Sequence, residues 1–390
     1  MTVDFLPYAK QSISEADKQA VSEALGSELI TRGFQVADFE RAMAEKCGAG
    51  YAVAFSSGTT ALMATYFAAN LSPYDRVIST PNTFIASVGV PIQMQKKLCF
   101  VDIDRTTGNL DLNLLEKELD VSFSRGRTFI VPVHFSGIAL DMRRLDSLIK
   151  DPNAVVIEDA AHALGSHYPS GEKVGSCAYS QMTIFSFHPA KTITTGEGGM
   201  VTTNDPELYH RLLLFRDNGI ERYSPYLKKT SALGYYEVQA ITGNFNFTSF
   251  QAALGLSQLL RLDEFVSKRR ALVRHYREQL KDWEHLKMFT AQYDELTAFH
   301  LFVVQINFQA SQTTREETMR TLKERGIGTQ VHYIPLYRHP ILEIGEERYS
   351  ELFPAMEGYY AEALSLPLYY DLTFEDVEKI CHILKEVLTF

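Results

Sequence analysis

One lysine, Lys191, stands in a stretch whose residue types restrict the backbone, FSFHPAKTITTGEGGM (Phe185–Met200). The stretch begins with apolar residues typical of a strand. Pro189 then ends a central strand, because proline cannot donate to the hydrogen-bond ladder. The glycines that follow allow backbone angles that other residues avoid. We therefore expect Lys191 on an ordered turn after a strand, although a solvated surface position is the ordinary alternative for a lysine.

A second polar stretch, SSGTTALM (Ser56–Met63), follows the apolar run YAVAF. Gly58 permits a tight turn, and Thr59 and Thr60 can begin a helix. The free N–H groups and hydroxyls at a helix N-terminus can bind phosphate. An ordinary helix cap uses the same residue types, so that phosphate binding and capping both remain open for this stretch.

A third polar stretch, IEDAAHALG (Ile157–Gly165), lies at the end of another apolar run. Glu158 and Asp159 end the expected strand, and each carboxylate either caps the next helix or faces a ligand. His162 lies one helical turn after Asp159, so the two side chains can share a face. The alternative for His162 is a satisfied core or surface histidine.

The carboxyl ends of strands in an open α/β sheet are where ligands collect. The three stretches would bring a phosphate site, a carboxylate and a lysine to one such edge. Pyridoxal phosphate needs all three, because it carries a phosphate, a ring nitrogen that works best protonated and an aldehyde that condenses with lysine. The lysine would anchor this cofactor and shuttle protons. The sequence therefore indicates a pyridoxal phosphate enzyme.

Short apolar runs in the first half of the chain are expected to form the sheet that positions these residues. They are Tyr51–Phe55, Arg76–Thr80, Leu98–Ile103, Thr128–Val133, Ala154–Asp159, Met182–Phe187 and Gly199–Thr203. Most are continuously apolar, as is typical of strands buried on both faces. Helical patterns such as Thr59–Ala69 and Asp111–Leu119 alternate with them, which predicts a mostly parallel sheet with helices on both faces.

After about Phe250 the pattern changes to a long amphipathic helix that runs to Leu280. The elements expected beyond it are the strands His300–Phe308 and Gly328–Ile334 and helices near Thr314–Glu324, Glu351–Leu364 and Phe374–Leu388. We expect two domains: a large cofactor-binding α/β domain with an N-terminal arm over residues 1–250, and a small C-terminal α+β domain over residues 251–390.

Composition limits the classes of function. The formal net charge of -10 argues against a nucleic-acid partner, because such affinity comes mainly from neutralised phosphates. The 4 cysteines form no CxxC pair, which fits a reducing compartment and argues against a disulfide frame or a zinc site. The N-terminal residues do not resemble a signal peptide, and no apolar stretch approaches the roughly 18 residues of a membrane span. We expect a cytoplasmic protein with no bound metal and no membrane partner.

Several motifs resemble those of one enzyme family. SFHPAKTITTGEGG, EDAAHALGS, SSGTTALM and QAALGLSQL together are similar to the sugar aminotransferases of the DegT/DnrJ/EryC1/StrS family, and the resemblance extends from GFQVADFE to LSLPLYYDLT. That family has the fold-type-I pyridoxal phosphate architecture and acts on nucleotide-linked keto sugars. The lysine motif is highly specific to it, whereas the SGTT motif alone is not.

The resemblance implies a role for each matched residue. Lys191 would carry the cofactor by condensing with its aldehyde, and Asp159 would pair with the ring nitrogen. The other implied cofactor contacts are His162 near the ring hydroxyl, Phe84 against the ring face, and Gly58, Thr59 and Ser186 at the phosphate. A sister branch of the family has histidine in place of the lysine and dehydrates sugars, so the lysine of this chain favours transamination.

A further match concerns the neighbouring subunit. Asn244, in GNFNFTSFQAALGL, matches an asparagine that reaches the phosphate of the other subunit, which implies a homodimer with shared active sites. Two positions depart from the family pattern: Asn246 stands where Arg is usual, and RDNG (Arg216–Gly219) carries Asn218 in place of His. These departures concern the interface and substrate contacts and leave the lysine chemistry intact.

Two segments bear on the substrate. SALGYYEVQAITGNFNFT (231–248) and TQVHYIPLYRHP (Thr329–Pro340) resemble the C4-aminotransferases of pseudaminic acid synthesis, which act on a UDP-linked 4-keto-6-deoxy-N-acetylhexosamine. The resemblance implies L-glutamate as the amino donor. It also implies that His332 and Tyr333 contact the substrate. Alternatively, His332 ends a buried strand and serves packing. The rival enzyme is a dTDP-sugar C3- or C4-aminotransferase of the same fold.

A non-catalytic regulator that binds pyridoxal phosphate is the alternative from another class of function. The intact set of Lys191, Asp159 and Phe84 argues against it, because a mere binder need not keep an electron sink together with a proton shuttle.

Overall fold

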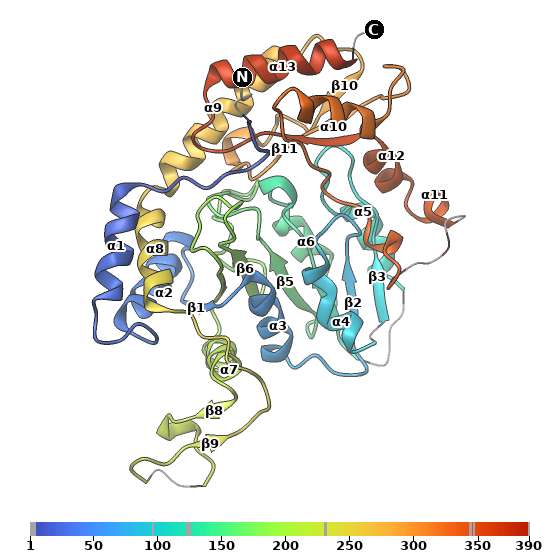
Figure 1. Ribbon diagram of the computed structural model, residues 1–390. Coiled ribbons are helices and arrows are strands. Elements are labelled where there is room, and N and C mark those ends of the chain that lie inside the picture. Colours follow the sequence, from blue (N-terminus) through green and yellow to red (C-terminus); the bar gives the residue numbers. More distant parts are fainter. Residues whose placement is uncertain are drawn as a thin grey trace.

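The computed structural model describes residues 5–95, 97–121, 126–229, 232–342, 345 and 348–388 (Figure 1). Residues 1–4 at the start of the chain and Ser231 at the start of SALGYYEVQAITGNFNFT lie outside the described residues. A central sheet covered by helices forms most of the molecule, and a smaller sheet with its own helices lies above it in the view of Figure 1.

Seven strands form the central sheet in the order β1-β7-β6-β5-β4-β2-β3. They are β1 (Tyr51–Phe55), β2 (Arg76–Ser79), β3 (Lys97–Phe100), β4 (Thr128–Val131), β5 (Val155–Asp159), β6 (Met182–Ser186) and β7 (Gly199–Thr203). Neighbours from β3 to β6 pair in parallel, whereas β7 pairs antiparallel with both β6 and β1. The expected mostly parallel sheet is confirmed, and the carboxyl ends of β5 and β6 lie at one edge.

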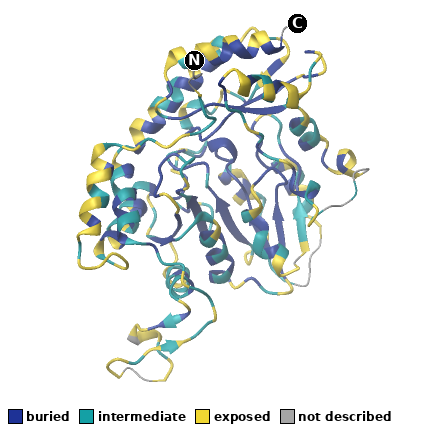
Figure 2. Ribbon diagram, in the orientation of Figure 1, coloured by how far each residue is buried: buried dark blue, intermediate teal, exposed yellow. Residues whose placement is uncertain are grey.

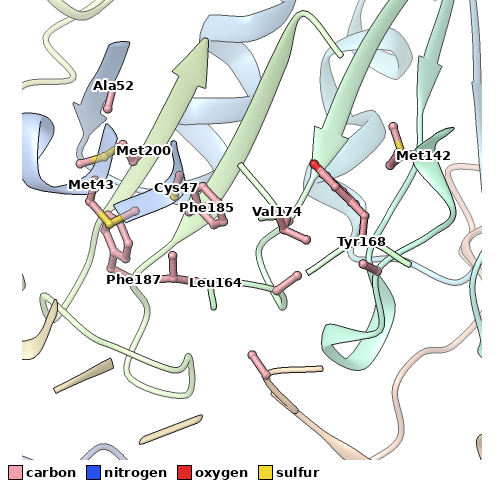
Figure 3. Close-up of a cluster of buried hydrophobic side chains, with 14 of the residues drawn as sticks. Met43, Cys47, Ala52, Met142, Leu164, Tyr168, Val174, Phe185, Phe187 and Met200 are labelled. Carbon is pink, nitrogen blue, oxygen red and sulfur yellow. The ribbon is translucent and has the colours of Figure 1, made fainter. Parts of the chain in front are cut away.

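Successive side chains of each strand point to opposite buried faces of the sheet. One face packs against the helices α2 (Phe34–Cys47), α5 (Leu112–Leu119), α6 (Met142–Leu148) and α8 (Ser249–Leu260). The other face packs against α3 (Gly58–Ala68), α4 (Gly89–Gln93) and α7 (Pro206–Arg216). In β6, for example, Phe185 lies in the first cluster, part of which is drawn in Figure 3, and Ile184 lies in the second. Burial on both faces explains why the strands are continuously apolar.

The C-terminal part contains an antiparallel sheet in the order β10-β11-β12. Its elements are β10 (Leu286–Met288), β11 (Phe302–Ile306), β12 (Ala363–Leu366), α9 (Leu262–Leu280), α10 (Arg315–Glu324), α11 (Tyr349–Leu352), α12 (Pro354–Glu362) and α13 (Phe374–Leu388). The N-terminal segment reaches this part, because Leu6 pairs with Ile327 in an isolated bridge. The first helix, α1 (Glu15–Leu25), packs instead against α8.

Three expectations for this part were wrong in detail. The helix expected to run unbroken to Leu280 is two helices, because Arg261 leaves helical geometry between α8 and α9. Residues 328–334 form no strand and make only the isolated bridge of Gln330 with Ser365. The helix expected as far as Leu364 ends at Glu362, because residues 363–366 pair with β11 as β12.

Helix α9 contributes side chains to two different hydrophobic clusters. Its first turns, with Leu262 and Phe265, pack with the central sheet, whereas the residues from Leu272 onward pack with the small sheet. The division of the chain at residue 250 stays a prediction.

After α7 the chain forms a two-stranded hairpin, β8 (Ile220–Glu221) and β9 (Glu237–Val238), that projects from the body (Figure 1). We call residues 220–242 the arm. Most of its described residues are exposed or intermediate (Figure 2). Large apolar side chains exposed on it are Tyr223, Tyr226, Leu233, Tyr236, Val238 and Ile241. Among the described helices, none combines the length and apolar character needed to cross a membrane.

Helix α8 can pack closely on α2 because Gly255 leaves room for the ring of Phe39. The ring of Phe39 also packs on Phe187, so this helix pair supports the turn that carries Lys191. A Cβ atom at position 255 would lie 2.6–2.9 Å from atoms of the Phe39 ring. We predict that Gly255→Ala lowers the free energy of unfolding by about 1–3 kcal/mol through overpacking. Denaturant unfolding measures the effect.

The matched control is Gly89→Ala in α4, where an added Cβ would meet no atom within 4 Å. This control is expected to be neutral or to stabilise the protein by up to about 1 kcal/mol. Equal stability of the two variants would contradict the proposed packing constraint.

Candidate active site

A cavity of about 410 Å³ lies at the carboxyl ends of the central strands. Every predicted site residue except Asn244 lines it: Gly58, Thr59, Phe84, Asp159, His162, Ser186, Lys191, His332 and Tyr333. The cavity size is in the usual range for small-molecule sites, roughly 300–1,000 Å³. Residues from both parts of the chain therefore form one site.

Lys191 lies on a turn after β6, as expected. The turn is closed by hydrogen bonds from the Lys191 N–H to the His188 carbonyl (2.8 Å) and from the Thr195 N–H to the Phe187 carbonyl (3.0 Å). The residue is half-buried, and desolvation of its ammonium group lowers the pKa of Lys191 to about 8, an effect that the charge of Asp159 partly opposes. The solvated surface position is thereby ruled out.

Asp159 ends β5, and its carboxylate is fixed from two sides. Its Oδ1 accepts from the Ala161 N–H at 3.1 Å, and its Oδ2 accepts from the Ser87 hydroxyl at 2.6 Å. Ser87 is held in turn, because its hydroxyl lies 2.6 Å from that of Thr83 and its carbonyl accepts from the Tyr66 hydroxyl at 2.5 Å. The carboxylate therefore faces the cavity in one orientation.

Glu158 points to the opposite side of β5, as the alternation of a strand requires. Its fully buried carboxylate accepts from His134 Nε2 (2.7 Å), the Tyr168 hydroxyl (2.7 Å) and the hydroxyls of Thr183 and Ser180. Burial alone would raise the pKa of Glu158, but these hydrogen bonds lower it below its ordinary value. Glu158 is thus a structural group outside the cavity.

The chain after β5 forms turns rather than the expected helix, so neither carboxylate caps a helix there. His162 nevertheless enters the cavity. The Ser136 N–H donates to its Nδ1 (3.3 Å), which places the proton on Nε2, 3.0 Å from the Tyr333 hydroxyl oxygen. Burial and the charge of Lys191 hold the pKa of His162 well below its usual value, so the ring is neutral. Because Tyr333 accepts this bond, its own proton is free for a ligand.

The N-terminus of α3 faces the same cavity. The Ser57 hydroxyl accepts from the Thr60 N–H. The N–H groups of Gly58 and Thr59 have no intrahelical acceptor, because they lie in the first turn of the helix. A Cβ atom at position 58 would lie 2.9 Å from Cβ of Ser186. Glycine therefore lets the Ser186 hydroxyl approach the first turn, and the cap and the candidate phosphate site coexist at α3.

Two residues predicted to contact the substrate also lie in the cavity wall. His332 Nδ1 is 2.8 Å from the Ser365 hydroxyl, and burial, together with the charge of Lys191, lowers its pKa to about 3. Tyr333 lies beside Phe84, with 6.5 Å between ring centroids, and Phe84 itself is 57% exposed at the cavity. Their roles toward a substrate stay predictions.

Asn244 lies outside the cavity of its own chain, at the base of the arm. Its Oδ1 accepts from the Asn246 side chain at 2.7 Å, and Asn246 Oδ1 accepts from Arg32 Nε at 3.2 Å. Arg32 also pairs with Asp217 at 3.3 Å. A guanidinium is thus present beside the position where the family usually has its own arginine.

Sequence reasoning missed several residues that the fold brings to the site, among them Ser57, Ser87 and His300. His300 Nε2 lies 3.5 Å from Nζ of Lys191. The only signal for His300 is a polar residue directly before an apolar strand pattern, and Ser87 gives no comparable signal because its partner is 72 positions away.

Comparison with known proteins gives a consistent match. Residues 11–385 match the DegT/DnrJ/EryC1/StrS aminotransferase family. A UDP-4-amino-4,6-dideoxy-N-acetyl-beta-L-altrosamine transaminase from Campylobacter jejuni is 32% identical over 98% of this chain and 97% of that protein. The solved structure of Helicobacter pylori PseC, an aminotransferase involved in the biosynthesis of pseudoaminic acid, is 30% identical with a TM-score of 0.87 over 99% of both chains.

A third similar structure is a putative sugar aminotransferase from Streptococcus pneumoniae in its PLP form, which is 26% identical with a TM-score of 0.85 over 98% of both chains. Pyridoxal phosphate is accordingly the cofactor. When bound, it supplies an electron sink for negative charge at the amine-bearing carbon. The cavity fits it, because the open first turn of α3, the fixed carboxylate of Asp159 and Lys191 line one space.

The fixed carboxylate generates a prediction. Asp159→Asn keeps the shape and removes the charge, so we expect folded, cofactor-bearing protein whose turnover falls by two or more orders of magnitude, roughly 2.7 kcal/mol or more. Ser87→Ala removes one hydrogen bond to that charge and should lower turnover by about tenfold. The conversion of the cofactor by L-glutamate, followed by its absorbance, measures both.

Ser79→Ala is the matched control, because Ser79 is equally buried and donates to the Val131 carbonyl (2.8 Å) away from the cavity. It should leave turnover near that of the wild type. A normal rate in Asp159→Asn would mean that another group serves the ring nitrogen.

Proposed function

The chain belongs to the DegT/DnrJ/EryC1/StrS aminotransferase family, and from this we propose that it transfers the amino group of L-glutamate to C4 of a UDP-linked 4-keto-6-deoxy-N-acetylhexosamine. Its activity as an aminotransferase follows from the family. The substrate is our proposal, and it is supported by the similarity to UDP-sugar transaminases from Campylobacter jejuni and Helicobacter pylori. The resemblance of residues 231–248 and 329–340 to the same branch supports it further.

One observation carries the chemistry: Lys191, Asp159 and the first turn of α3 line a single cavity. Because its pKa is about 8, a larger share of Lys191 is the neutral amine near neutral pH than for a solvated lysine. The neutral amine is the form that can act as nucleophile and base. Asp159 supplies a fixed negative charge that would hold the ring nitrogen cationic.

The remaining polar groups of the cavity suit binding and orientation. The first turn of α3 with Ser186 would hold the cofactor phosphate, and Phe84 would lie against the ring face. Tyr333 can donate its proton to an oxygen of the cofactor or the substrate, because its own oxygen accepts from His162. His332, neutral through burial, would contact the sugar.

We further propose that two copies of the chain form a homodimer with shared sites. Asn244 lies outside its own cavity and beside the arm, which carries exposed apolar side chains such as Leu233 and Ile241. Apolar residues on a projecting segment are expected to be covered by a partner. In the dimer, Asn244 would reach the cofactor phosphate of the other subunit.

A panel of nucleotide-linked 4-keto-6-deoxy sugars with ¹⁵N-labelled L-glutamate tests the substrate. We predict that the UDP-linked N-acetylhexosamine is preferred over dTDP-linked sugars by about tenfold or more in kcat/KM. Product mass should show one ¹⁵N, and NMR should place it at C4. Lys191→Ala is the inactive control. Preference for a dTDP-sugar or amination at C3 would support the rival enzyme, and the absence of any cofactor conversion by glutamate would support a non-catalytic binder.

A mixed dimer tests the shared site. Lys191→Ala and Asn244→Asp chains are each expected to be impaired, the second because its charge repels phosphate. A mixed dimer has one site with both defects and one with neither. We predict that mixing restores part of the wild-type activity. If chains exchange, as mass spectrometry can verify, and no activity returns, Asn244 does not act across the interface.

A further inference from the structure

We propose that His300 is a positioning residue for Lys191: its Nε2 accepts a hydrogen bond from the lysine nitrogen and thereby fixes the direction of that nitrogen in the cavity. The inference rests on the proposed role of Lys191 and is independent of which sugar the enzyme accepts. His300 lies just before β11, outside all motifs that the sequence singled out, and it is delivered to a lysine that follows β6.

The contact is buried, and its length is at the upper limit of hydrogen-bond distance. Nε2 of His300 lies 3.5 Å from Nζ of Lys191, and His300 is only 4% exposed. Its ring lies 4.3 Å from the ring of His162, centroid to centroid. Nδ1 of His300 is buried and has no hydrogen-bond partner among the residues that the structure describes. Lys191 is therefore the one described polar side chain that His300 bonds.

The hydrogen-bond chemistry assigns the direction of this bond. An ammonium group can only donate, so Nε2 must accept while Lys191 is charged, and the ring proton then resides on Nδ1. The ring remains neutral, because burial and then the positive charges of Lys191 and Arg269 hold the pKa of His300 well below its usual value. A neutral imidazole without other partners is an acceptor dedicated to the lysine.

The backbone around His300 is held from both parts of the chain. Its N–H donates to the Ser136 carbonyl (3.0 Å), and the Ser136 hydroxyl donates to the Leu301 carbonyl (2.7 Å). From α9, the buried guanidinium of Arg269 donates to the carbonyls of Phe299 (3.2 Å) and His300 (3.4 Å). Phe299 has a φ of 50°, a conformation that non-glycine residues seldom adopt and that clusters at functional sites.

Ser136 connects the two histidines. It donates its N–H to His162 and accepts from the N–H of His300. Ser136 itself has a φ of 61°. One residue thus holds both the ring of His162 and the backbone of His300, so that the two histidines are positioned together.

The consequence concerns the amine form of Lys191. When one N–H of the amine is donated to His300, rotation about the last bond of the side chain is restricted. The lone pair is then held toward the cavity, where the reacting carbon would lie. The titratable and charged groups that face Lys191 and His300 are Tyr8, Asp159, His162, His188, Glu197, Arg269, His332 and Tyr333. Among the residues that the structure describes, none of these groups hydrogen-bonds the side chain of Lys191, whereas His300 does.

The test measures the pKa of Lys191 in the apoenzyme through the pH dependence of its labelling by an amine-directed reagent, read by peptide mass spectrometry. The wild type should give a midpoint near 8. His300→Phe keeps an aromatic ring against His162 and removes the acceptor from the ammonium group, so the midpoint should fall by about one pH unit. His300→Gln restores an acceptor and should return the midpoint toward the wild-type value.

The loaded enzyme gives a second readout. His300→Phe should lower kcat by about tenfold or more with little change in KM for glutamate, because orientation of the lysine is lost and binding is not. His275→Phe is the matched control, since His275 lies on α9 and bonds Glu378 at 3.1 Å, away from the cavity. An unchanged Lys191 midpoint in His300→Phe would overturn the proposal.

A measurement on the unsubstituted apoenzyme covers the case in which His300→Phe does not fold. With ¹⁵N-labelled histidine, the His300 signal, identified by its loss in His300→Gln, should report a neutral ring with the proton on Nδ1. A proton on Nε2, or a charged ring near neutral pH, would overturn the proposal. None of these readouts contains a sugar, so they are unaffected if the substrate proposal fails, whereas an active Lys191→Ala would remove the role of Lys191 itself.

Discussion

The carboxylate of Asp159 is held between the N–H of Ala161 and the hydroxyl of Ser87, and the remainder of the site is arranged around this fixed charge. Hydrogen bonds to a charged group are stronger and shorter than neutral ones, so they set orientation as well as energy. Lys191 lines the same cavity, and desolvation of its ammonium group lowers its pKa. A fixed negative charge and a desolvated amine in one cavity are what the chemistry of the cofactor requires.

The positions of Asp159 and Lys191 both depend on the register of the strands that precede them, β5 and β6. Asp159 and Glu158 are neighbours in β5, and their side chains take opposite sides of the sheet. A slip of one residue would exchange them and place Asp159 among the hydroxyls that now satisfy Glu158. The register of β5 is therefore fixed from both faces of the sheet. Four donors hold Glu158 on one face, and the hydrogen bonds of Asp159 hold that carboxylate on the other. The buried core therefore helps to fix the position of the Asp159 carboxylate at the cavity.

The second part of the chain completes the cavity from above. His300, His332 and Tyr333 reach it from segments with little regular structure, and hydrogen bonds to Ser136, Ser365 and His162 help to hold them. Burial removes the charge from His162, His300 and His332, so these three side chains line the cavity of Lys191 as neutral acceptors and donors. An ammonium in such surroundings loses hydration without facing further positive charge, which keeps its pKa near the range of enzyme chemistry.

The sequence by itself determined the parallel sheet, the turn after β6 and the meeting of Lys191, Asp159 and Gly58 at one edge. These follow from local rules, because apolar runs bounded by proline, glycine and helix-capping residues specify strands and turns, and parallel strands bring their carboxyl ends together. The choice of Asp159 over Glu158 came from the resemblance to the family, because local rules alone leave open which of two carboxylates at the end of one strand faces the cavity. The strand predicted over residues 328–334 does not form, and His332 and Tyr333 of this segment line the cavity instead. Only the tertiary structure brought His300 to Lys191 and Ser87 to Asp159, which are 109 and 72 positions apart. Such contacts have no periodicity in the sequence, because they depend on how separate loops are placed by the packing of the elements between them.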